Sequence, residues 1–323
     1  MLRRSLTSPP ARRVGAALLT LLGVAVAVFL MLRAIPGDQV TAAYGTEAAA
    51  LSPEQREALA AYYGTDRPLV VQFFAWLGAV ATGNLGFSAR AQQSVLEMTV
   101  AALPVTLELA LIAIVIALVV GVPLGMLSAS RPNAVRDWVG QGVGLAGLGV
   151  PAFLLATTLL AVAAQSYGFN PNGLGYVPLW EDPVLNLQQM AMPAAVLGFG
   201  IAAPIMRTTR TAVLEVRGLD FVRTARAKGV PPGRLRRHHV LRNALVPITT
   251  ITGLQFGYLL GGAVVVEQIF SLPGIGRQVL VGINQKEYAV VQSTVLVIAL
   301  LFVVVNLLTD LLYRRIDPRV RAA

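Results

Sequence analysis

The sequence predicts an all-α integral membrane protein that crosses the lipid bilayer six times. Three observations lead to this fold class: 55% of the 323 residues are hydrophobic, only 13% are charged, and long segments carry no charge. Soluble domains carry about 25% charged residues, and a membrane-spanning helix needs about 20 apolar ones. The uncharged segments are 14–32, 109–130, 138–180, 183–206, 243–266 and 288–309.

The first and third of these segments need separate arguments. The first follows four arginines and resembles a signal peptide, but its 19 uncharged residues exceed the 7 to 15 of a cleavable apolar region, so we expect a retained anchor. The third is long enough for two crossings. Polar, turn-forming residues at 165–173 end its helix near Gln165, which leaves one span.

The basic residues give the orientation. Of the 26 lysines and arginines, 20 lie before the first span, after the last, or in the loops that share their side of the membrane. By the positive-inside rule, both termini are cytoplasmic in a multi-pass protein of the plasma or inner membrane. The net charge of +10 therefore reflects topology, and we expect no nucleic-acid partner. Cysteine is absent, which excludes disulfides and thiolate metal sites.

Residues 34–100 are expected to form an external segment between the first two spans. A short helix begins at Ser52, with Pro53 at its first position and Gln55 completing a capping box, and it stops at Gly64. A second, aromatic-rich helix over 68–81 suits the membrane interface, and a turn follows at 82–88. A structural collar and a substrate-docking role both remain open.

Within the spans, glycines recur at four-residue spacing. The pairs and triplet are 121/125, 140/144 and 253/257/261. Such faces allow close helix packing, and sliding helices would use the same residues. Prolines at 104, 123, 151, 193, 204 and 247 suit kinked or broken helices. Glu108 and Glu267 lie in apolar surroundings, which suggests either a functional role or pairing near the outer surface.

The loop 207–242 holds 10 basic and 2 acidic residues between two spans. Within it, Phe221, Val222 and Ala225 have helical spacing, and Gly229 followed by two prolines ends the helix. A short helix held between two spans can act as a lever if a soluble partner binds it in a groove. Binding of the basic loop to anionic lipid is the alternative, and periodicity alone leaves both open.

The segment 220–229 resembles the coupling segment of ABC-importer permeases, in the form typical of the oligopeptide/dipeptide/nickel family. Further matches follow in order over about residues 100–318. They are at 102–111, 207–210, 224–229, 239–247, 262–271, 273–276 and 310–313. The external Arg67-Pro68 and the run 83–86 also look like the first, B-type member of the family's two paired permeases.

The resemblance implies a type I ABC-importer transmembrane domain with six transmembrane helices and an external segment between helices 1 and 2. It divides the chain into an N-terminus with the first helix (1–33), the external segment (34–100), the transmembrane core (101–313, coupling loop 207–242) and a cytoplasmic tail (314–323). The coupling helix would comprise Asp220, Phe221, Val222, Arg223, Thr224, Ala225, Arg226, Ala227, Lys228 and Gly229.

The implied function is a permease subunit of an ATP-driven importer of di- and oligopeptides or similar small solutes. Its expected partners are a second homologous permease, two ATPase subunits or one tandem ATPase, an extracytoplasmic substrate-binding protein and membrane lipid. ATP and Mg would bind to the ATPases, since this chain has no Walker-type loop and is expected to hold no cofactor.

Two alternatives stay open beside this function. One is a nickel or metal-chelate permease of the same family. The other is an integral-membrane enzyme, although no hydrolase motif occurs in the chain. The adjacent His238 and His239 diverge by about 100° on a helix and rarely share a metal, so no metal site is expected there.

The sequence departs from the general importer motif in two places. The Glu-Ala-Ala that begins this motif is replaced by Arg223, Thr224 and Ala225. The downstream Ile-x-Leu-Pro pattern reads His239, Val240, Leu241 and Arg242. Both differences are usual in the peptide-type branch, and the salt bridge of the motif's glutamate is not carried over.

Overall fold

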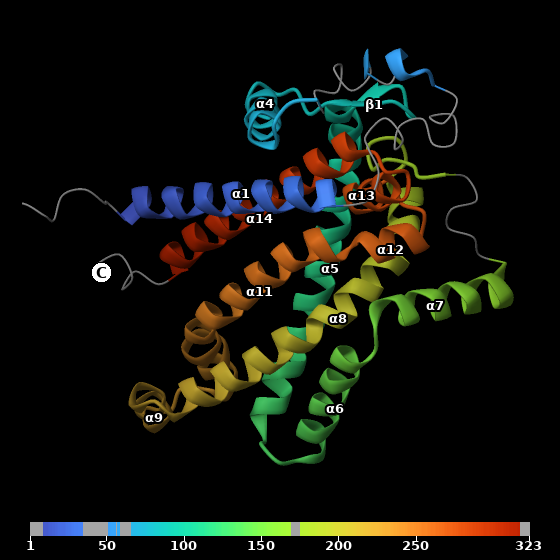
Figure 1. Ribbon diagram of the computed structural model, residues 1–323. Coiled ribbons are helices and arrows are strands. Elements are labelled where there is room, and N and C mark those ends of the chain that lie inside the picture. Colours follow the sequence, from blue (N-terminus) through green and yellow to red (C-terminus); the bar gives the residue numbers. More distant parts are fainter. Residues whose placement is uncertain (1–8, 35–50, 56, 59–65, 169–174, 317–323) are drawn as a thin grey trace, which may run out of the picture. The chain divides into compact units, whose positions relative to one another are not determined.

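A computed structural model (Figure 1) describes residues 9–34, 51–55, 57–58, 66–168 and 175–316. The chain divides into two compact units. Unit 1 comprises residues 1–104 and 273–303, and unit 2 comprises residues 105–272 and 304–323. The end of the predicted tail, 317–323, lies outside the described residues.

Unit 1 is built from helices and one short hairpin. Its elements are α1 (Pro9–Ala34), α4 (Leu69–Ala81), β1 (Phe87–Ser88), β2 (Gln93–Ser94), the start of α5 (Val95–Ser130), α13 (Ile275–Asn284) and the start of α14 (Tyr288–Ile316). Helix α4 meets α1 through aromatic rings: Phe29 and Phe73 make an edge-to-face contact with centroids 5.2 Å apart. Arg33 donates from Nε to Gln72 at 3.0 Å, which ties the end of α1 to α4.

The local features predicted for residues 34–100 are confirmed where the structure describes them. Ser52 and Gln55 form the reciprocal capping box, with bonds of 2.9 and 3.2 Å, while the expected stop at Gly64 lies outside the described residues. The turn at 82–88 uses Gly83 and Gly86, both with positive φ. The structure adds an antiparallel hairpin of β1 and β2, in which Phe87 lies opposite Ser94.

Unit 2 surrounds α8. Its elements are the rest of α5, α6 (Val135–Gly149), α7 (Ala152–Tyr167), α8 (Pro183–Gly218), α9 (Asp220–Ala227), α10 (Pro232–Arg234), the π-helix η2 (Leu235–Leu241), α11 (Arg242–Gly262), α12 (Val264–Ile269) and the end of α14. Helix α8 packs against both α6 and α11 and lies between them in Figure 1. Its first turn is capped by Asp182, whose carboxylate accepts from the backbone N–H groups of Val184 and Leu185 at 3.0 Å.

The six predicted spans correspond to five continuous helices and one bent pair. The described residues contain five helices long and apolar enough to cross a membrane, and a sixth span if α6 and α7 count as one. These two helices meet at 94°, so the single third span expected from the sequence is broken. The break lies at Val150 and Pro151, both extended, because proline lacks an N–H and disfavours a helical residue before it.

The other prolines in the spans stay inside helices. Pro193 and Pro204 lie within α8 and Pro247 within α11. Two of the α5 glycines approach α8 closely. A Cβ at Gly121 would lie 2.8 Å from the carbonyl oxygen of Ala202, and one at Gly125 would lie 2.5 Å from that of Met206. The predicted close packing is therefore confirmed for this glycine pair.

Candidate functional site

Helix α9 forms within the loop as the sequence predicts. It begins after Leu219, whose extended backbone (φ −75°, ψ 147°) separates it from α8. Asp220 stands in its first turn and makes an exposed ion pair with Arg223 at 3.2 Å. An acidic residue at this end of a helix is favourable because it faces the positive end of the helix dipole.

The predicted glycine termination is also confirmed. Gly229 has φ +76°, its N–H donates to Arg226 at 3.0 Å, and the N–H of Val230 donates to Ala225 at 3.2 Å. This pair of bonds is a Schellman motif, in which a left-handed residue satisfies the last carbonyls of the helix. Helix α9 therefore has a defined end rather than a frayed one.

Burial on α9 differs from the expected pattern in one important respect. Val222 is fully buried and Ala225 is 8% exposed, and both pack inside this chain. Their core cluster comprises Ala129, Ala212, Val213, Val216, Leu235, Val240, Ala244 and Ile248. Phe221, by contrast, is 42% exposed. Two of the three apolar residues with helical spacing are thus buried within this chain, because i and i+3 positions share the face that turns toward α8.

The exposed face of α9 is correspondingly polar with one aromatic side chain. Beside Phe221 it presents Arg223, Thr224, Ala227 and Lys228. Any binding surface on α9 therefore centres on Phe221, which sequence periodicity did not distinguish from its buried neighbour Val222.

The chain returns from α9 through a π-helix that the sequence did not predict. Pro232 opens α10, and η2 follows directly and leads into α11 without a break. Leu235 and Val240 of η2 are buried in the same cluster as Val222. Short π-helical turns are often found at functional sites. The adjacent histidines lie in η2, and no group of three potential metal ligands exists in the part of the chain that the structure describes.

A buried ion pair braces α8 beside α9. Arg210 donates to Asp137 from Nε and Nη2, each at 2.8 Å, and the Asp137 side chain is only 1% exposed. The same carboxylate accepts from Ser128, from the N–H of Asn133 at 2.9 Å and from Gln141 at 3.0 Å. A bidentate, fully hydrogen-bonded pair is the geometry in which a buried salt bridge is stable.

Arg217 supports the same region. Its guanidinium donates to the carbonyl oxygens of Ala129 and Ser130 and so fastens the end of α8 to the end of α5. For the Arg210–Asp137 ion pair, the sequence did contain a signal, since Asp137 is a single acidic residue directly before an uncharged segment. The sequence did not show that its partner would be Arg210.

A second polar cluster lies at the other end of the α5–α8 pair. Glu108 accepts from the hydroxyl of Tyr176 at 3.1 Å and from Nδ2 of Asn186 at 3.4 Å. Asn186 also donates to the carbonyl of Val177 at 3.0 Å. Burial and the neighbouring Glu108 carboxylate raise the pKa of Tyr176, so its hydroxyl remains a donor at neutral pH. Buried oxygens of Glu108 (Oε1) and Asn186 (Oδ1) accept no hydrogen bond in the described residues.

Glu267 is fully buried and accepts a hydrogen bond of 2.6 Å from the Thr106 hydroxyl. Both acidic side chains of the spans are thus paired, Glu267 with a hydroxyl donor and Glu108 with a hydroxyl and an amide donor.

Comparison with known proteins places this architecture in a family. Residues 121–322 match the model of the binding-protein-dependent transport system inner membrane component, and residues 10–110 match the model of the N-terminal part of such membrane components. The chain belongs to this family, and it is a multi-pass membrane subunit of an ABC importer rather than an enzyme.

Individual relatives cover almost the whole chain. It is 36% identical to the dipeptide transport system permease protein DppB of Escherichia coli (strain K12) over 332 residues, covering 96% of this chain and 97% of the relative. It is 38% identical over 310 residues to a protein of Brucella abortus (strain 2308) that is assigned by its name to a peptide transport system, covering 96% and 98%.

Two solved structures share the fold. The methionine ABC transporter MetNI, in inward-facing conformations, aligns with a TM-score of 0.53 at 18% identity, covering 68% of this chain and 96% of that one. An amino acid ABC transporter crystallised with histidines aligns with a TM-score of 0.51 at 16% identity, covering 68% and 94%. The predicted fold class, an ABC-importer transmembrane domain, is thereby confirmed.

Proposed function

We propose that this chain is the B-type permease of an importer for dipeptides or oligopeptides. The observation that carries the proposal is its 36% identity to a dipeptide permease over 96% of the chain. The peptide-permease names of these relatives favour peptides over a nickel or metal-chelate cargo. In this arrangement an extracytoplasmic binding protein selects the cargo, so calorimetric titration of that protein with peptides and with nickel chelates tests the substrate. Binding of the chelates alone would contradict the proposal.

Helix α9 is the proposed coupling helix, with the residues 220–229 expected from the sequence. Its buried face, Val222 and Ala225, joins it to α8 and η2 through one apolar cluster. Its exposed face, centred on Phe221, is left for the groove of an ATPase subunit. A displacement of α9 by the ATPase would therefore reach both α8 and α11, since the cluster includes residues of both helices.

The proposed assembly contains a second homologous permease, two ATPase subunits or one tandem ATPase, and the binding protein. ATP and Mg bind to the ATPases. Both termini and the loop 207–242 lie in the cytoplasm, the segment 34–100 lies outside, and the division of the core at 101–313 follows the sequence.

The first experiment tests the exposed face of α9. Replacing Phe221 with alanine removes an aromatic side chain that is 42% exposed while leaving the core cluster intact. We expect ATPase affinity to fall about tenfold to a hundredfold, as for a central aromatic contact, with the permease pair still assembled. Co-purification of the ATPase measures the effect.

The matched control is Leu245→Ala, which truncates another partly exposed apolar residue (37%) outside α9. It should leave ATPase recruitment nearly unchanged. The lipid-binding alternative predicts a different ranking, in which a variant without the charges of Arg223 and Lys228 loses more than Phe221→Ala. That ranking would reject the coupling assignment.

The second experiment tests orientation, using the absence of native cysteine. Gly233→Cys in the proposed cytoplasmic loop should resist an impermeant thiol reagent added to intact cells. Ala91→Cys, an exposed position in the external segment, should react. Labelling of Gly233→Cys from outside would contradict the proposed topology.

A further inference from the structure

Two adjoining pockets beside α9 have an unusual combination of linings. The first, of about 490 Å³, lies among the ends of α5, α8, α9 and η2 and is lined by arginines at 131, 136, 217, 226 and 236. The second, of about 810 Å³, continues between η2 and α5. Met126 and Arg236 line both pockets, so the two pockets adjoin.

The first pocket has an uncompensated positive charge. No acidic side chain lines either pocket among the described residues. The guanidinium groups of four of the five arginines (131, 136, 226 and 236) make no hydrogen bond or ion pair within the described part of the chain, whereas that of Arg217 donates to backbone carbonyls. Several guanidinium groups around one concavity favour an anionic ligand with several acceptor oxygens, such as a phosphate group.

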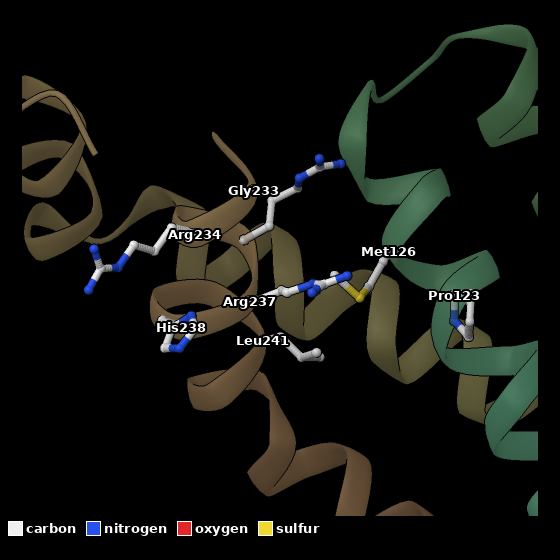
Figure 2. A pocket seen from close by; sticks show the side chains of 8 residues that line it. Pro123, Met126, Gly233, Arg234, Arg237, His238 and Leu241 are labelled. Carbon is white, nitrogen blue, oxygen red and sulfur yellow. The ribbon is translucent and has the colours of Figure 1, made fainter. Parts of the chain in front are cut away.

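The second pocket adds an apolar wall. Pro123 and Met126 of α5 face Leu241 across it, and Figure 2 shows Arg237 pointing from η2 toward Met126 while Arg234 points away from α5. Arg234, Arg236, Arg237 and His238 also line this pocket, so it has an apolar wall on α5 and a basic wall on α10 and η2. A free phosphate or a carboxylate of a soluble partner would use only the basic wall.

The depth of the combined pockets separates these occupants. The uncharged segment 109–130 is about long enough to cross the hydrocarbon layer, so Ser130 lies near its edge. Pro123 precedes Ser130 by seven residues in α5, which places it roughly 10 Å deeper at 1.5 Å per residue. The headgroup layer is only about 5–7 Å thick on each side. An occupant that touches both Ser130 and Pro123 extends from the headgroup layer into the hydrocarbon.

We propose that the two pockets form a binding site for one anionic phospholipid, with its phosphate among the arginines of the first pocket and its acyl chain along Met126 and Pro123 in the second. Because Val222 and Arg226 of α9 line the first pocket, the bound headgroup contacts the coupling helix itself. The site therefore links the charge of the surrounding membrane to the position of α9. The lipid site itself rests on the pocket geometry, whereas its leaflet and its link to coupling rest on the proposed function.

The test uses the complete complex of permeases and ATPases, titrated with phosphatidylglycerol or with neutral phosphatidylcholine. Native mass spectrometry measures bound lipid without requiring transport, so the result is independent of the proposed substrate. We expect the double variant Arg136→Gln/Arg236→Gln to weaken phosphatidylglycerol binding about thirtyfold, from two lost headgroup contacts. Phosphatidylcholine binding should not change.

The control double variant is Arg207→Gln/Arg242→Gln. It removes the same charge from exposed arginines that line neither pocket, and it should change binding less than about threefold because isolated surface charges contribute little. Equal weakening by both double variants would show attraction to the general surface and overturn the proposal.

A third arm tests the apolar half of the site. Met126→Trp fills the second pocket without altering charge and should abolish retention of phosphatidylglycerol. If tryptophan prevents assembly, Met126→Gln removes the apolar character at similar length.

Displacement of the lipid by inorganic phosphate, with no effect of the Met126 variants, would indicate a free-anion site instead. Loss of ATPase co-purification by the Arg136/Arg236 variant, with lipid binding unchanged, would show that acidic residues of the ATPase occupy the pocket. Either result would overturn the proposal.

Discussion

The two ends of α8 are held to their neighbours by different chemistry. Beside α9, Arg210 and Asp137 form a buried bidentate ion pair, and the carboxylate accepts from three further donors, on Ser128, Asn133 and Gln141. At the opposite end, Glu108 receives one hydroxyl and one long amide bond, and two buried oxygens accept nothing among the described residues.

The Arg210–Asp137 end is therefore held in one geometry, whereas the hydrogen bonds at the Glu108 end can be exchanged for others. Charge-assisted hydrogen bonds are roughly twice as strong as neutral ones, and a fully satisfied network has one favoured geometry. A cluster with unused acceptor oxygens has a less sharply defined geometry, and these oxygens can accept hydrogen bonds from other donors, including water, at little cost. If an ATPase moves α9, as proposed, the ion-paired end must keep its geometry so that the displacement is passed on to α8.

The largest expected effect comes from breaking the charged end. Asp137→Asn leaves the Arg210 guanidinium without its carboxylate, and removing one member of a buried pair typically costs 3–5 kcal/mol. We expect about 3 kcal/mol here, because the Arg210 side chain is 23% exposed and keeps some hydration. Thermal unfolding of the purified permease pair measures the loss.

The control is Asp220→Asn, which breaks the exposed pair with Arg223 on α9. An exposed pair of this kind contributes at most about 1 kcal/mol, so its melting temperature should stay close to that of the unmodified protein. If Asp137→Asn were as mild as Asp220→Asn, the buried pair would not be a structural joint.

An intermediate effect is expected at the end of α9. Gly229 has φ +76° with open space around it, so a methyl group meets no clash and the cost is conformational. Gly229→Ala should destabilise the protein by about 1–2 kcal/mol. Gly233→Ala, also in open space but without positive φ, should be neutral. Comparable losses from both variants would rule out the left-handed cap as the cause.

The smallest effect is expected at the neutral end. Tyr176→Phe removes the hydroxyl donor to Glu108 and should cost about 1 kcal/mol. The exposed Tyr258→Phe is the control.

The pH dependence sharpens this test. The pKa of Tyr176 is raised in the folded protein above its usual value of 10.0, so its contribution to stability is present below that pH and declines as the pH rises above it. Tyr176→Phe should remove this alkaline loss, whereas Tyr258→Phe should preserve it. An unchanged alkaline profile in Tyr176→Phe would place the titration elsewhere.

The sequence predicted the helices of this protein well where local chemistry decides the outcome. Uncharged length located the spans, and the glycine followed by two prolines located the end of α9. It failed where tertiary contacts decide. Phe221 and Val222 are adjacent and both apolar, and only the position of α8 determines which is buried.

Two further features were beyond sequence reasoning for the same reason. The partner of Asp137 lies 73 residues away, and nothing local distinguishes Arg210 from the other arginines of the loop. A proline lies at the 94° break before α7, but α8 and α11 also contain prolines and remain continuous. Whether a proline bends or ends a helix depends on which neighbours satisfy the backbone groups it frees.

The π-helix has a consequence for how this region tolerates insertions and deletions. A π-turn contains about one residue more than an α-turn, so η2 stores an extra residue within an otherwise continuous helix that leads into α11. Deleting one residue of η2 can therefore relax it to an α-helix while the turns before and after it keep nearly their present relative orientation. A deletion within the regular α-helix α11 has no such reserve, because every side chain on one side of it would rotate by about 100° relative to the other. The region should therefore tolerate the loss of one residue in η2 better than the loss of one in α11.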